Sequence, residues 1–343
     1  MGHNPARVES TSPAAFYCVS DASYFLGAVA MVNSLRVLGH SEPIYVLDCG
    51  LTESQRNHLS AEARVVPASD DSPPFLQKTA AMRAHPAQVM VLIDTDIIVT
   101  RPLGGLIEQA SQDRVVAVAD RLDRFIPEWG ELLGLGPAHP RQYISSSLVL
   151  LGGGFGERVV QLMDEAQHRI ALEGAAYSRA LEPTSEDKST IRGFNLNDGT
   201  FDSSVLEHPW CFADQDVLNA VLSIAATPDH VQALDARLTA GPPFTGVTVL
   251  DEQTLRCAYE DGTEPYALHH VFPVKPWLEP TIPGVYSQLL TRLLHGRDVG
   301  VRVPNRELPP HLRSGLLSAP TRLRALRDRF RREPAPMGFE DHG

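Results

Sequence analysis

Cysteine and long hydrophobic runs are scarce in this sequence, and each scarcity excludes a class of protein. None of the four cysteines forms a C-x-x-C pair; they are Cys18, Cys49, Cys211 and Cys257. The sequence therefore predicts neither a zinc knuckle nor a disulfide scaffold, and it favours a reducing cytoplasm. No apolar run approaches the roughly 20 residues of a membrane span, and the N-terminal stretch MGHNPARVESTSPAAF has no long apolar core. We therefore expect a soluble, cytoplasmic protein.

Positive charge is also in short supply. The 343 residues include 42 acidic and 30 basic side chains, which gives a net charge of −12. A nucleic-acid binder needs clustered Lys and Arg for phosphate contacts, so we expect no nucleic-acid partner. Only three of the basic residues are lysines: Lys78, Lys188 and Lys275. An anionic substrate must therefore be met by a few local cations or by a metal ion.

The chain does contain an alternation of strand and helix patterns, with 43% hydrophobic residues to build a core. Short apolar runs predict strands at Phe16–Ser20, Pro43–Leu47, Arg64–Val66, Val89–Ile93, Val115–Ala119 and Ser145–Leu151. Helical periodicity predicts helices at Tyr24–Leu38, Thr52–Ala61, Phe75–His85, Phe155–Leu172 and Asp214–Leu222. This order is typical of an α/β fold with a mostly parallel central sheet flanked by helices. In such folds ligands bind at the carboxyl ends of the strands.

Two segments depart from this alternation. Residues 173–208 are polar and weakly periodic, and we interpret them as an insertion or lid. Residues 300–343 form a basic extension whose short amphipathic stretch predicts a helical tail; its arginines are Arg313, Arg322, Arg324, Arg327, Arg329, Arg331 and Arg332. Peripheral contact with an anionic membrane, a solvated surface helix and a homodimer contact are three open interpretations of this tail.

The stretch VMVLIDTDIIV places two carboxylates, Asp94 and Asp96, inside a very hydrophobic run. In an extended segment side chains alternate, so both carboxylates project to one side while Thr95 points away. Two hard oxygen donors on one side suit Mg²⁺ or Mn²⁺ holding a diphosphate. The alternative is a strand end that simply carries two solvated acids.

Four motifs in order resemble the GT-A glycosyltransferases, most closely family 8, which includes glycogenin and bacterial lipopolysaccharide galactosyltransferases. They are the N-terminal strand–helix unit, DTD after a buried strand, DQD at a later helix, and HHVFPVKPW. The resemblance covers about residues 14–295. It implies a Rossmann-like GT-A domain over 14–299, with a donor-nucleotide half at about 14–120 and an acceptor half at about 121–299.

The resemblance also implies a donor site. It places Asp21 at the base or ribose and Tyr24 near the base of a UDP-sugar, and it uses Lys78 as a basic residue that reaches the donor. The full implied donor set is Ser20, Asp21, Tyr24, Lys78, Asp94, Thr95 and Lys275. A helix cap is a second interpretation of Asp21, compatible with the first, and a solvated helix face is the alternative for Lys78.

For the metal, the resemblance implies Asp94, Asp96 and the His of H-x-x-G-x-x-K-P-W. Counting back from Lys275 selects His269, and an Asp/Asp/His set suits Mn²⁺ somewhat better than Mg²⁺. Lys275 is then expected to stabilise the leaving diphosphate. The motif's Gly is Phe272 here and a proline follows it, so the loop cannot copy a glycine turn. His270 is therefore a rival ligand, and we place His269 ahead of it.

On the acceptor side the resemblance implies that Asp214 binds sugar hydroxyls and that Gln215 lies on the face where the acceptor attacks. Asp214 has a second interpretation as a helix cap. Asp216 is a weaker candidate for a nucleophile. The three serines 145–147 stand where the family has an Asn-Ser-Gly stretch, without its Asn.

Together these features predict a retaining, metal-dependent hexosyltransferase. It would move glucose or galactose from a UDP-sugar to a hydroxyl on a glycan or small-molecule acceptor. A sugar nucleotidyltransferase is one alternative, but such enzymes carry a Gly-rich basic loop after the first strand, where this chain has CVSDASYFLG. A non-catalytic module that binds nucleotide sugars is the other alternative.

Overall fold

The computed structural model describes residues 13–68, 73–181, 190–191, 194–195, 208–272, 274–280 and 284–313, with backbone alone between 171 and 195. The chain divides into two compact units, Met1–Arg302 and Val303–Gly343. The described part of the second unit holds two 3-10 turns, Asn305–Glu307 and Pro310–Leu312. The predicted basic tail beyond Arg313 lies outside the described residues.

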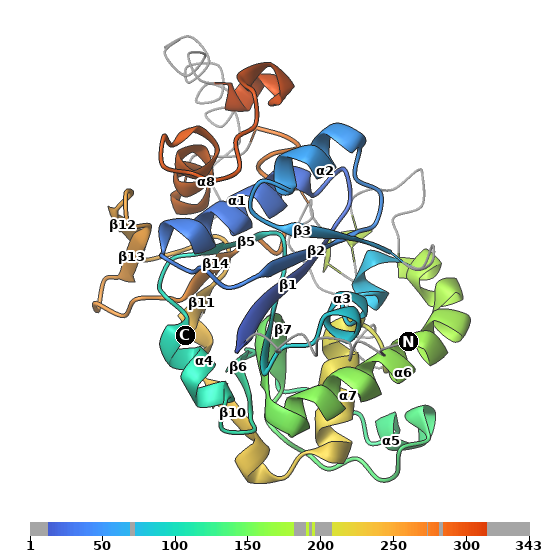
Figure 1. Ribbon diagram of the computed structural model, residues 1–343. Helices are drawn as coiled ribbons and strands as arrows, with labels where there is room; N and C mark the ends of the chain where they lie inside the picture. Colours follow the sequence, from blue (N-terminus) through green and yellow to red (C-terminus); the bar gives the residue numbers. More distant parts are fainter. Residues whose placement is uncertain are drawn as a thin grey trace, which may run out of the picture. The chain divides into compact units, whose positions relative to one another are not determined.

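A seven-stranded sheet forms the centre of the first unit, in the order β10-β6-β7-β4-β1-β2-β3 (Figure 1). Its strands are β1 Ala14–Ser20, β2 Ile44–Asp48, β3 Arg64–Pro67, β4 Val89–Ile93, β6 Val115–Ala119, β7 Ile144–Gly152 and β10 Val231–Leu234. Within this sheet β7 pairs antiparallel with both of its neighbours, while every other pair is parallel. The prediction of a mostly parallel α/β sheet is therefore confirmed, and the carboxyl ends of β1, β4 and β6 share one edge.

Helices cover both faces of this sheet (Figure 1). Side chains alternate along β4, so Met90 and Leu92 pack on the face that carries Met163 and Val217. The helices on that face are α3 Ala80–Ala84, α5 Trp129–Leu133, α6 Gly153–Leu181 and α7 Asp214–Ala225. The other face is covered by α1 Phe25–Val37 and α4 Gly104–Ala110, and α8 Val285–His295 packs against α1. Helix α1 is buried along most of its length because it lies between two layers.

Short strands that the sequence did not predict complete the unit. Strand β5, Ile97–Val99, pairs antiparallel with β14, Ala267–His269, and β14 pairs with β11, Thr239–Ala240. Strands β12 and β13 form a hairpin over Val247–Asp251 and Arg256–Tyr259, and β8 and β9 form a small ladder over Thr190–Ile191 and Phe194–Asn195. Runs of two or three residues carry too little periodicity to be recognised in a sequence.

Two helix predictions were wrong in their limits. The segment predicted as one helix from Phe75 to His85 is a 3-10 turn over Pro74–Leu76 followed by the short helix α3. The helix expected to end at Leu172 continues to Leu181, so the first nine residues of the predicted insertion 173–208 are helical. A single Gly174 costs only about 1 kcal/mol in an alanine-rich stretch, too little to end a helix. Most of the predicted lid lies outside the described residues.

Helix α2, Glu53–Leu59, lies within the predicted segment Thr52–Ala61, and Thr52 is its N-cap. Thr52 accepts a hydrogen bond from the backbone N–H of Gln55, and the Gln55 side chain accepts one from the backbone N–H of Thr52. This reciprocal capping satisfies two donors that a helix start leaves free. In the described part of the chain, no helix has the length and apolar character needed to cross a membrane.

Candidate active site

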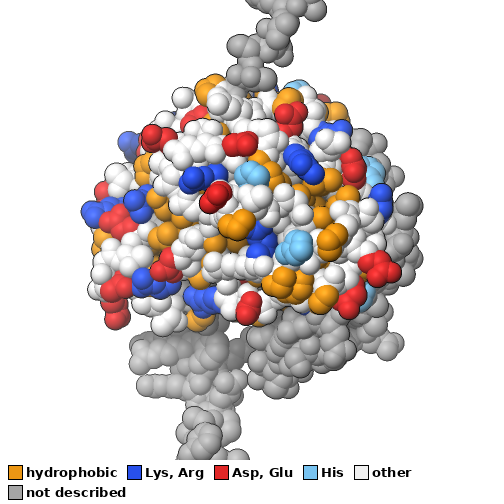
Figure 2. Space-filling model, turned by 90° about the horizontal axis from the view of Figure 1, so that it is seen from below, with side chains coloured by type: hydrophobic (Ala, Val, Ile, Leu, Met, Phe, Trp, Pro, Cys, Tyr) orange, Lys and Arg blue, Asp and Glu red, His pale blue; other side chains and the backbone are white. Residues whose placement is uncertain are grey.

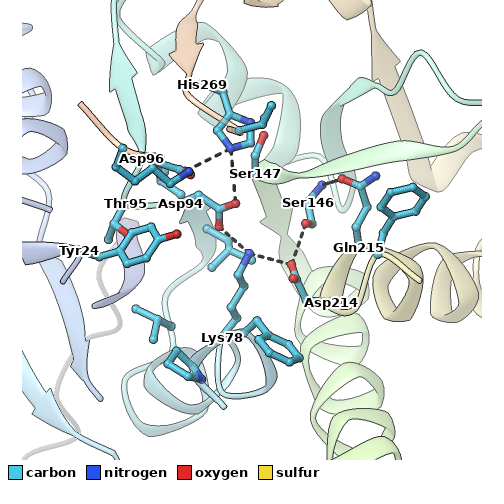
Figure 3. A pocket seen from close by; sticks show the side chains of 18 of the residues that line it. Tyr24, Lys78, Asp94, Thr95, Asp96, Ser146, Ser147, Asp214, Gln215 and His269 are labelled. Atoms are coloured by element: carbon cyan, nitrogen blue, oxygen red, sulfur yellow. Dashed lines mark hydrogen bonds and ion pairs between the residues drawn. The ribbon is translucent and has the colours of Figure 1, made fainter. Parts of the chain in front are cut away.

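A pocket of about 660 Å³ opens beside the carboxyl ends of β1, β4 and β6 and the start of α7. Nearly all the residues predicted for the site line it: Asp21, Tyr24, Lys78, Asp94, Thr95, Asp96, Asp214, Gln215, His269 and Lys275. Figure 3 shows most of these side chains, among them Lys78, Asp94 and Asp214, converging from separate elements of the fold. Ser20 is the exception, because it is buried and donates its hydroxyl to the carbonyl of Asp21.

The two carboxylates of DTD lie in a turn between β4 and β5. The backbone N–H of Ile97 donates to the carbonyl of Asp94, so the segment is not extended as the sequence analysis assumed. Both carboxylates nevertheless point toward His269, because the turn brings them to one side. The turn packs closely on α1 at Gly27, where a Cβ would lie 2.4 Å from the carbonyl oxygen of Thr95. Glycine at this position therefore lets the turn approach the helix.

His269 reaches this turn through strand pairing. Strand β14 runs antiparallel to β5 with His269 opposite Ile97, and the backbone N–H of His270 donates to the carbonyl of Asp96. The His269 Nε2 atom lies 3.2 Å from Asp96 Oδ1 and 4.0 Å from Asp94 Oδ2. One ligand atom from each of the three residues lies within 4.8 Å of the others.

The cluster of Asp94, Asp96 and His269 fits a divalent cation. Asp96 Oδ1 is buried and lies 3.2 Å from His269 Nε2, but the two atoms are not aligned as a hydrogen bond. A buried carboxylate oxygen without a hydrogen bond is costly unless another partner completes it. Burial acts to raise the pKa of Asp96, but the neighbouring His269 and Lys275 outweigh burial and hold that pKa well below its ordinary value. One carboxylate oxygen from each of two aspartates beside an imidazole is a ligand set that Mn²⁺ or Mg²⁺ accepts.

The rival ligand His270 points elsewhere. Its ring packs among Phe244, Phe272 and Tyr286, with its centroid 5.1 Å from that of Tyr286. Burial lowers the pKa of His270, so its ring is neutral in this apolar surrounding. The geometry therefore favours His269.

Two lysines flank the Asp/Asp/His cluster in the same way. Lys78 Nζ donates to Asp94 Oδ1 at 2.5 Å, and Lys275 Nζ donates to Asp96 Oδ2 at 2.7 Å. Each lysine thus takes one carboxylate oxygen and leaves the other on the side of His269. Lys78 Nζ also donates to Asp214 Oδ2 at 2.7 Å. Burial acts to lower the pKa of Lys78, but the charges of Asp214 and Asp94 outweigh burial and raise that pKa above its ordinary value.

Lys275 is less accessible than the sequence analysis expected. It lines the pocket, but it is only 3% exposed and donates a second hydrogen bond to the carbonyl of His270. Next to it, Trp277 donates its indole N–H to the carbonyl of Ser23 and packs edge-on against Tyr24. The KPW stretch therefore fixes both Asp96 and the loop after β1.

The loop after β1 brings Asp21 close to the start of α1, although the N-cap of this helix is Tyr24 and not Asp21. Asp21 Oδ1 accepts hydrogen bonds from the backbone N–H and the hydroxyl of Ser23 and from the N–H of Tyr24, just before α1 begins. Asp21 and Tyr24 also line the pocket. A cap-like role therefore leaves Asp21 at the site.

The start of α7 supplies a second wall of the pocket, which Lys78 joins to Asp94. Asp214 Oδ2 accepts hydrogen bonds from Lys78 and from the Ser146 hydroxyl, the latter at 2.7 Å. The helix-cap interpretation of Asp214 is wrong, because the N-cap is Ala213 and no side chain caps the helix. Gln215 donates to Asp120 Oδ2 at 3.0 Å and accepts from the backbone N–H of Ser146 at 3.2 Å.

Asp120 and the hydrogen-bonding role of Ser146 were missed by the sequence analysis. Asp120 directly follows the buried strand VVAVA, just as Asp94 follows VMVLI, so the same signal was present. Ser146 and Ser147 line the pocket, and Ser145 shares a hydroxyl–hydroxyl contact of 2.9 Å with Ser147.

Asp216 is an anchor of the fold, and the suggestion that it acts as a nucleophile is wrong. It is fully buried and binds Arg124 Nε at 2.7 Å, the Tyr143 hydroxyl at 2.7 Å and the backbone N–H of Phe212 at 2.6 Å. Burial raises its pKa despite the Arg124 charge. These contacts hold the segment before α7 in place.

The molecular surface shows no separation of charge on the face seen in Figure 2. Acidic, basic and hydrophobic side chains are interspersed there among the described residues. A continuous basic stripe of the kind that binds nucleic acid is not seen on that face.

Comparisons with known proteins gave matches among solved structures only; no protein-family model and no curated protein matches the sequence. The galactosyltransferase LgtC, solved with donor and acceptor sugar analogs, is 14% identical over 85% of this chain and 98% of that chain, with a TM-score of 0.49. The bifunctional glycosyltransferase WbbM is 16% identical over 85% of this chain and 50% of that chain, with a TM-score of 0.45.

A third match is the glycosyltransferase GlyE of Streptococcus pneumoniae TIGR4, 14% identical over 83% of this chain and 61% of that chain, with a TM-score of 0.46. All three of these proteins are glycosyltransferases.

Proposed function

We propose that this protein is a metal-dependent glycosyltransferase that moves a hexose, glucose or galactose, from a UDP-sugar to a hydroxyl acceptor with retention of configuration. One observation carries the proposal. Asp94, Asp96 and His269 meet in the same pocket as Asp214 and Gln215, and Lys78 joins Asp94 to Asp214. A cation site directly beside a second polar group of one pocket suits a reaction in which a diphosphate leaves from one side of a sugar.

Asp94, Asp96 and His269 would hold Mn²⁺ or Mg²⁺. When bound, the cation supplies positive charge that stabilises the departing diphosphate. Lys78 and Lys275 fix the two carboxylates by occupying one oxygen of each. They therefore orient the ligands before the donor arrives, as partners of metal ligands commonly do.

Asp21, Tyr24 and Thr95 border the part of the pocket assigned to the nucleoside. Asp21 and the KPW loop hold Tyr24 from two directions, through a backbone hydrogen bond and through Trp277. A ring fixed in this way offers a preformed surface for a base. The protein would then lose less conformational freedom when the donor binds.

Asp214 and Gln215 border the part assigned to the transferred sugar and the acceptor. Both side chains are already oriented, Asp214 by Lys78 and Ser146 and Gln215 by Asp120 and Ser146. A carboxamide is a poor nucleophile, and Asp216 is buried away from the pocket. This arrangement favours attack by the acceptor on the same face as the leaving group over a covalent intermediate on Asp216.

The test is release of nucleotide from a panel of UDP- and GDP-sugars with Mn²⁺ and without acceptor. We expect slow release of UDP from one sugar, loss of release on chelation, and loss in Asp96→Ala and His269→Ala. Asp261→Ala, a change at an exposed acid outside the pocket lining, serves as the control. Metal-dependent binding of UDP with no turnover would instead support a binding module, and neither binding nor release would contradict the proposal.

A further inference from the structure

The rim of the pocket carries apolar side chains that the proposed transfer does not use. Seven large hydrophobic side chains of the described residues are exposed, and four of them lie between residues 271 and 278: Val271, Phe272, Val274 and Leu278. A fifth, Leu122, follows β6. Val271 is 53% exposed and Leu122 is 38% exposed, and both line the pocket. Exposed apolar surface that continues into a binding pocket commonly marks where a ligand binds.

Besides Val19, Leu92 and Ile93 of the central sheet, apolar lining comes from four separate segments. Pro74 and Phe75 lie in the 3-10 turn, Leu122 follows β6, Phe212 precedes α7, and Val271 follows β14. The charged and amide groups are held by hydrogen bonds to one another. Lys78 donates to Asp94 and Asp214, as Figure 3 shows, and Gln215 donates to Asp120. The pocket thus combines a polar centre with apolar borders.

Leucine and valine carry no hydrogen-bonding group and no flat ring. A sugar is normally held by hydrogen bonds and by an aromatic ring against its C–H face, and neither Leu122 nor Val271 offers these. Burial of an apolar group against them is favourable because both are exposed to water in the free protein.

We propose that the acceptor carries an alkyl or aryl group next to the hydroxyl that receives the sugar, and that this group packs against Leu122 and Val271. The inference rests on the proposed glycosyl transfer. The acceptor oxygen bonds to the anomeric carbon as the bond from that carbon to the diphosphate oxygen breaks, and the hydroxyl proton leaves with the nucleotide. The apolar group keeps the acceptor in place and excludes water from the reacting face.

The charges around these apolar side chains favour an acceptor molecule over a membrane surface as the occupant. Acidic side chains lie beside the apolar ones: Asp120 and Asp123 flank the Leu122 segment, and Glu279 follows Leu278. Arg121 is exposed next to Leu122. Lys275, the basic residue within 271–280, is buried and paired with Asp96. An anionic bilayer favours Lys and Arg around inserted apolar groups, which this rim does not provide.

A chain-length series tests the inference. Dissociation constants of methyl, butyl and hexyl β-D-glucoside, measured by ligand-observed NMR with UDP and Mn²⁺ present, should fall with chain length. We expect hexyl to bind at least about tenfold more tightly than methyl, because each buried CH₂ adds affinity. The near-isosteric variants Leu122→Asn and Val271→Thr should lose most of this ratio. Leu132→Asn and Leu250→Asn alter exposed leucines outside the pocket lining and should keep it.

Three results would overturn the inference. The first is equal binding of methyl and hexyl glucosides, and the second is a ratio that survives in Leu122→Asn and Val271→Thr. The third is pelleting with phosphatidylglycerol vesicles that Val271→Thr abolishes, which would assign the rim to a membrane. Release of UDP without acceptor is measured in parallel and reports on the transferase alone. Absence of that release with an intact chain-length ratio would overturn the proposed function, and the acceptor role with it.

Discussion

The chain contains two Asp-x-Asp triplets at the same pocket, and their carboxylates have different roles. In Asp94-Thr95-Asp96 both carboxylates point to His269, whereas in Asp214-Gln215-Asp216 only the first faces the pocket. The backbone explains the difference. The first triplet lies in a turn, and the second lies in the first turn of a helix, where residues two apart point about 200° from each other. The same pattern therefore gives an Asp/Asp/His cluster in one place and a pocket residue plus a core anchor in the other.

Replacing Asp216 should have the largest effect on folding. In Asp216→Ala the Arg124 guanidinium loses its carboxylate in a buried position, and we expect a loss of about 3 to 5 kcal/mol in the free energy of unfolding. Urea denaturation followed by circular dichroism measures it. Asp261→Ala, at an exposed ion pair, should change stability by less than about 0.5 kcal/mol. A cost for Asp216→Ala no larger than that of this control would contradict the anchor role.

Replacing Asp96 should reduce activity more than stability, the reverse of what we expect for Asp216. Asp96→Asn keeps the shape but removes a charged ligand, so metal-dependent release of UDP should fall by about 100-fold or more. Its stability should change less than that of Asp216→Ala, because Lys275 keeps a partner in the carbonyl of His270. Assays of released UDP at fixed times measure the activity, and urea titrations measure the stability. A fully active Asp96→Asn enzyme would remove Asp96 from the metal set.

Gly27→Ala tests whether the close approach of the turn to α1 positions the carboxylates. The added Cβ would lie 2.4 Å from the Thr95 carbonyl oxygen and 2.6 Å from the Trp277 ring, so the turn must shift. We expect a loss of about 1 to 3 kcal/mol of stability together with weaker Mn²⁺ binding, measured by calorimetry. Gly105→Ala, at a site with open space in the helix α4, is the control. Unchanged Mn²⁺ affinity in Gly27→Ala would show that the turn is held by other contacts.

Ser146→Ala should have the smallest effect and acts on the second triplet alone. It removes the hydroxyl that donates to Asp214 and leaves the backbone N–H that donates to Gln215. A lost hydrogen bond to a charged group, worth about 1.5 kcal/mol, predicts a decrease of about tenfold in turnover with little change in Mn²⁺ affinity. Steady-state kinetics and calorimetry on the same preparation test this. A drop in Mn²⁺ affinity equal to the drop in turnover would contradict the division between the two walls.

Much of the fold was predictable because its main elements are long and periodic. The buried runs at β4 and β6 and the capping pattern at Thr52 are local signals that no distant residue overrides. The limits of the Phe75–His85 segment were not predictable in this way. There Lys78 is fixed by ion pairs to Asp94 and Asp214, which lie far away in the sequence.

The site was predictable in its members and less so in their contacts. His269 was found by counting back from Lys275, yet its place beside Asp96 depends on pairing of three-residue strands that carry no recognisable pattern. Likewise, nothing local distinguishes Asp216, which turns into the core, from Asp214, which faces the pocket. Burial and partners decide this difference, and both arise only when Arg124 and Tyr143 are brought to the same place.

The most direct measurement is calorimetric titration of UDP into the protein with Mn²⁺, with Mg²⁺ and after chelation, in the native chain and in two variants of neighbouring histidines. His269→Ala removes the ring that faces Asp94 and Asp96, whereas His270→Phe keeps an aromatic ring against Tyr286. The account predicts UDP binding that requires the cation, is lost in His269→Ala and persists in His270→Phe. Cation-independent binding of UDP, or equal loss in both variants, would contradict a metal centre formed by Asp94, Asp96 and His269.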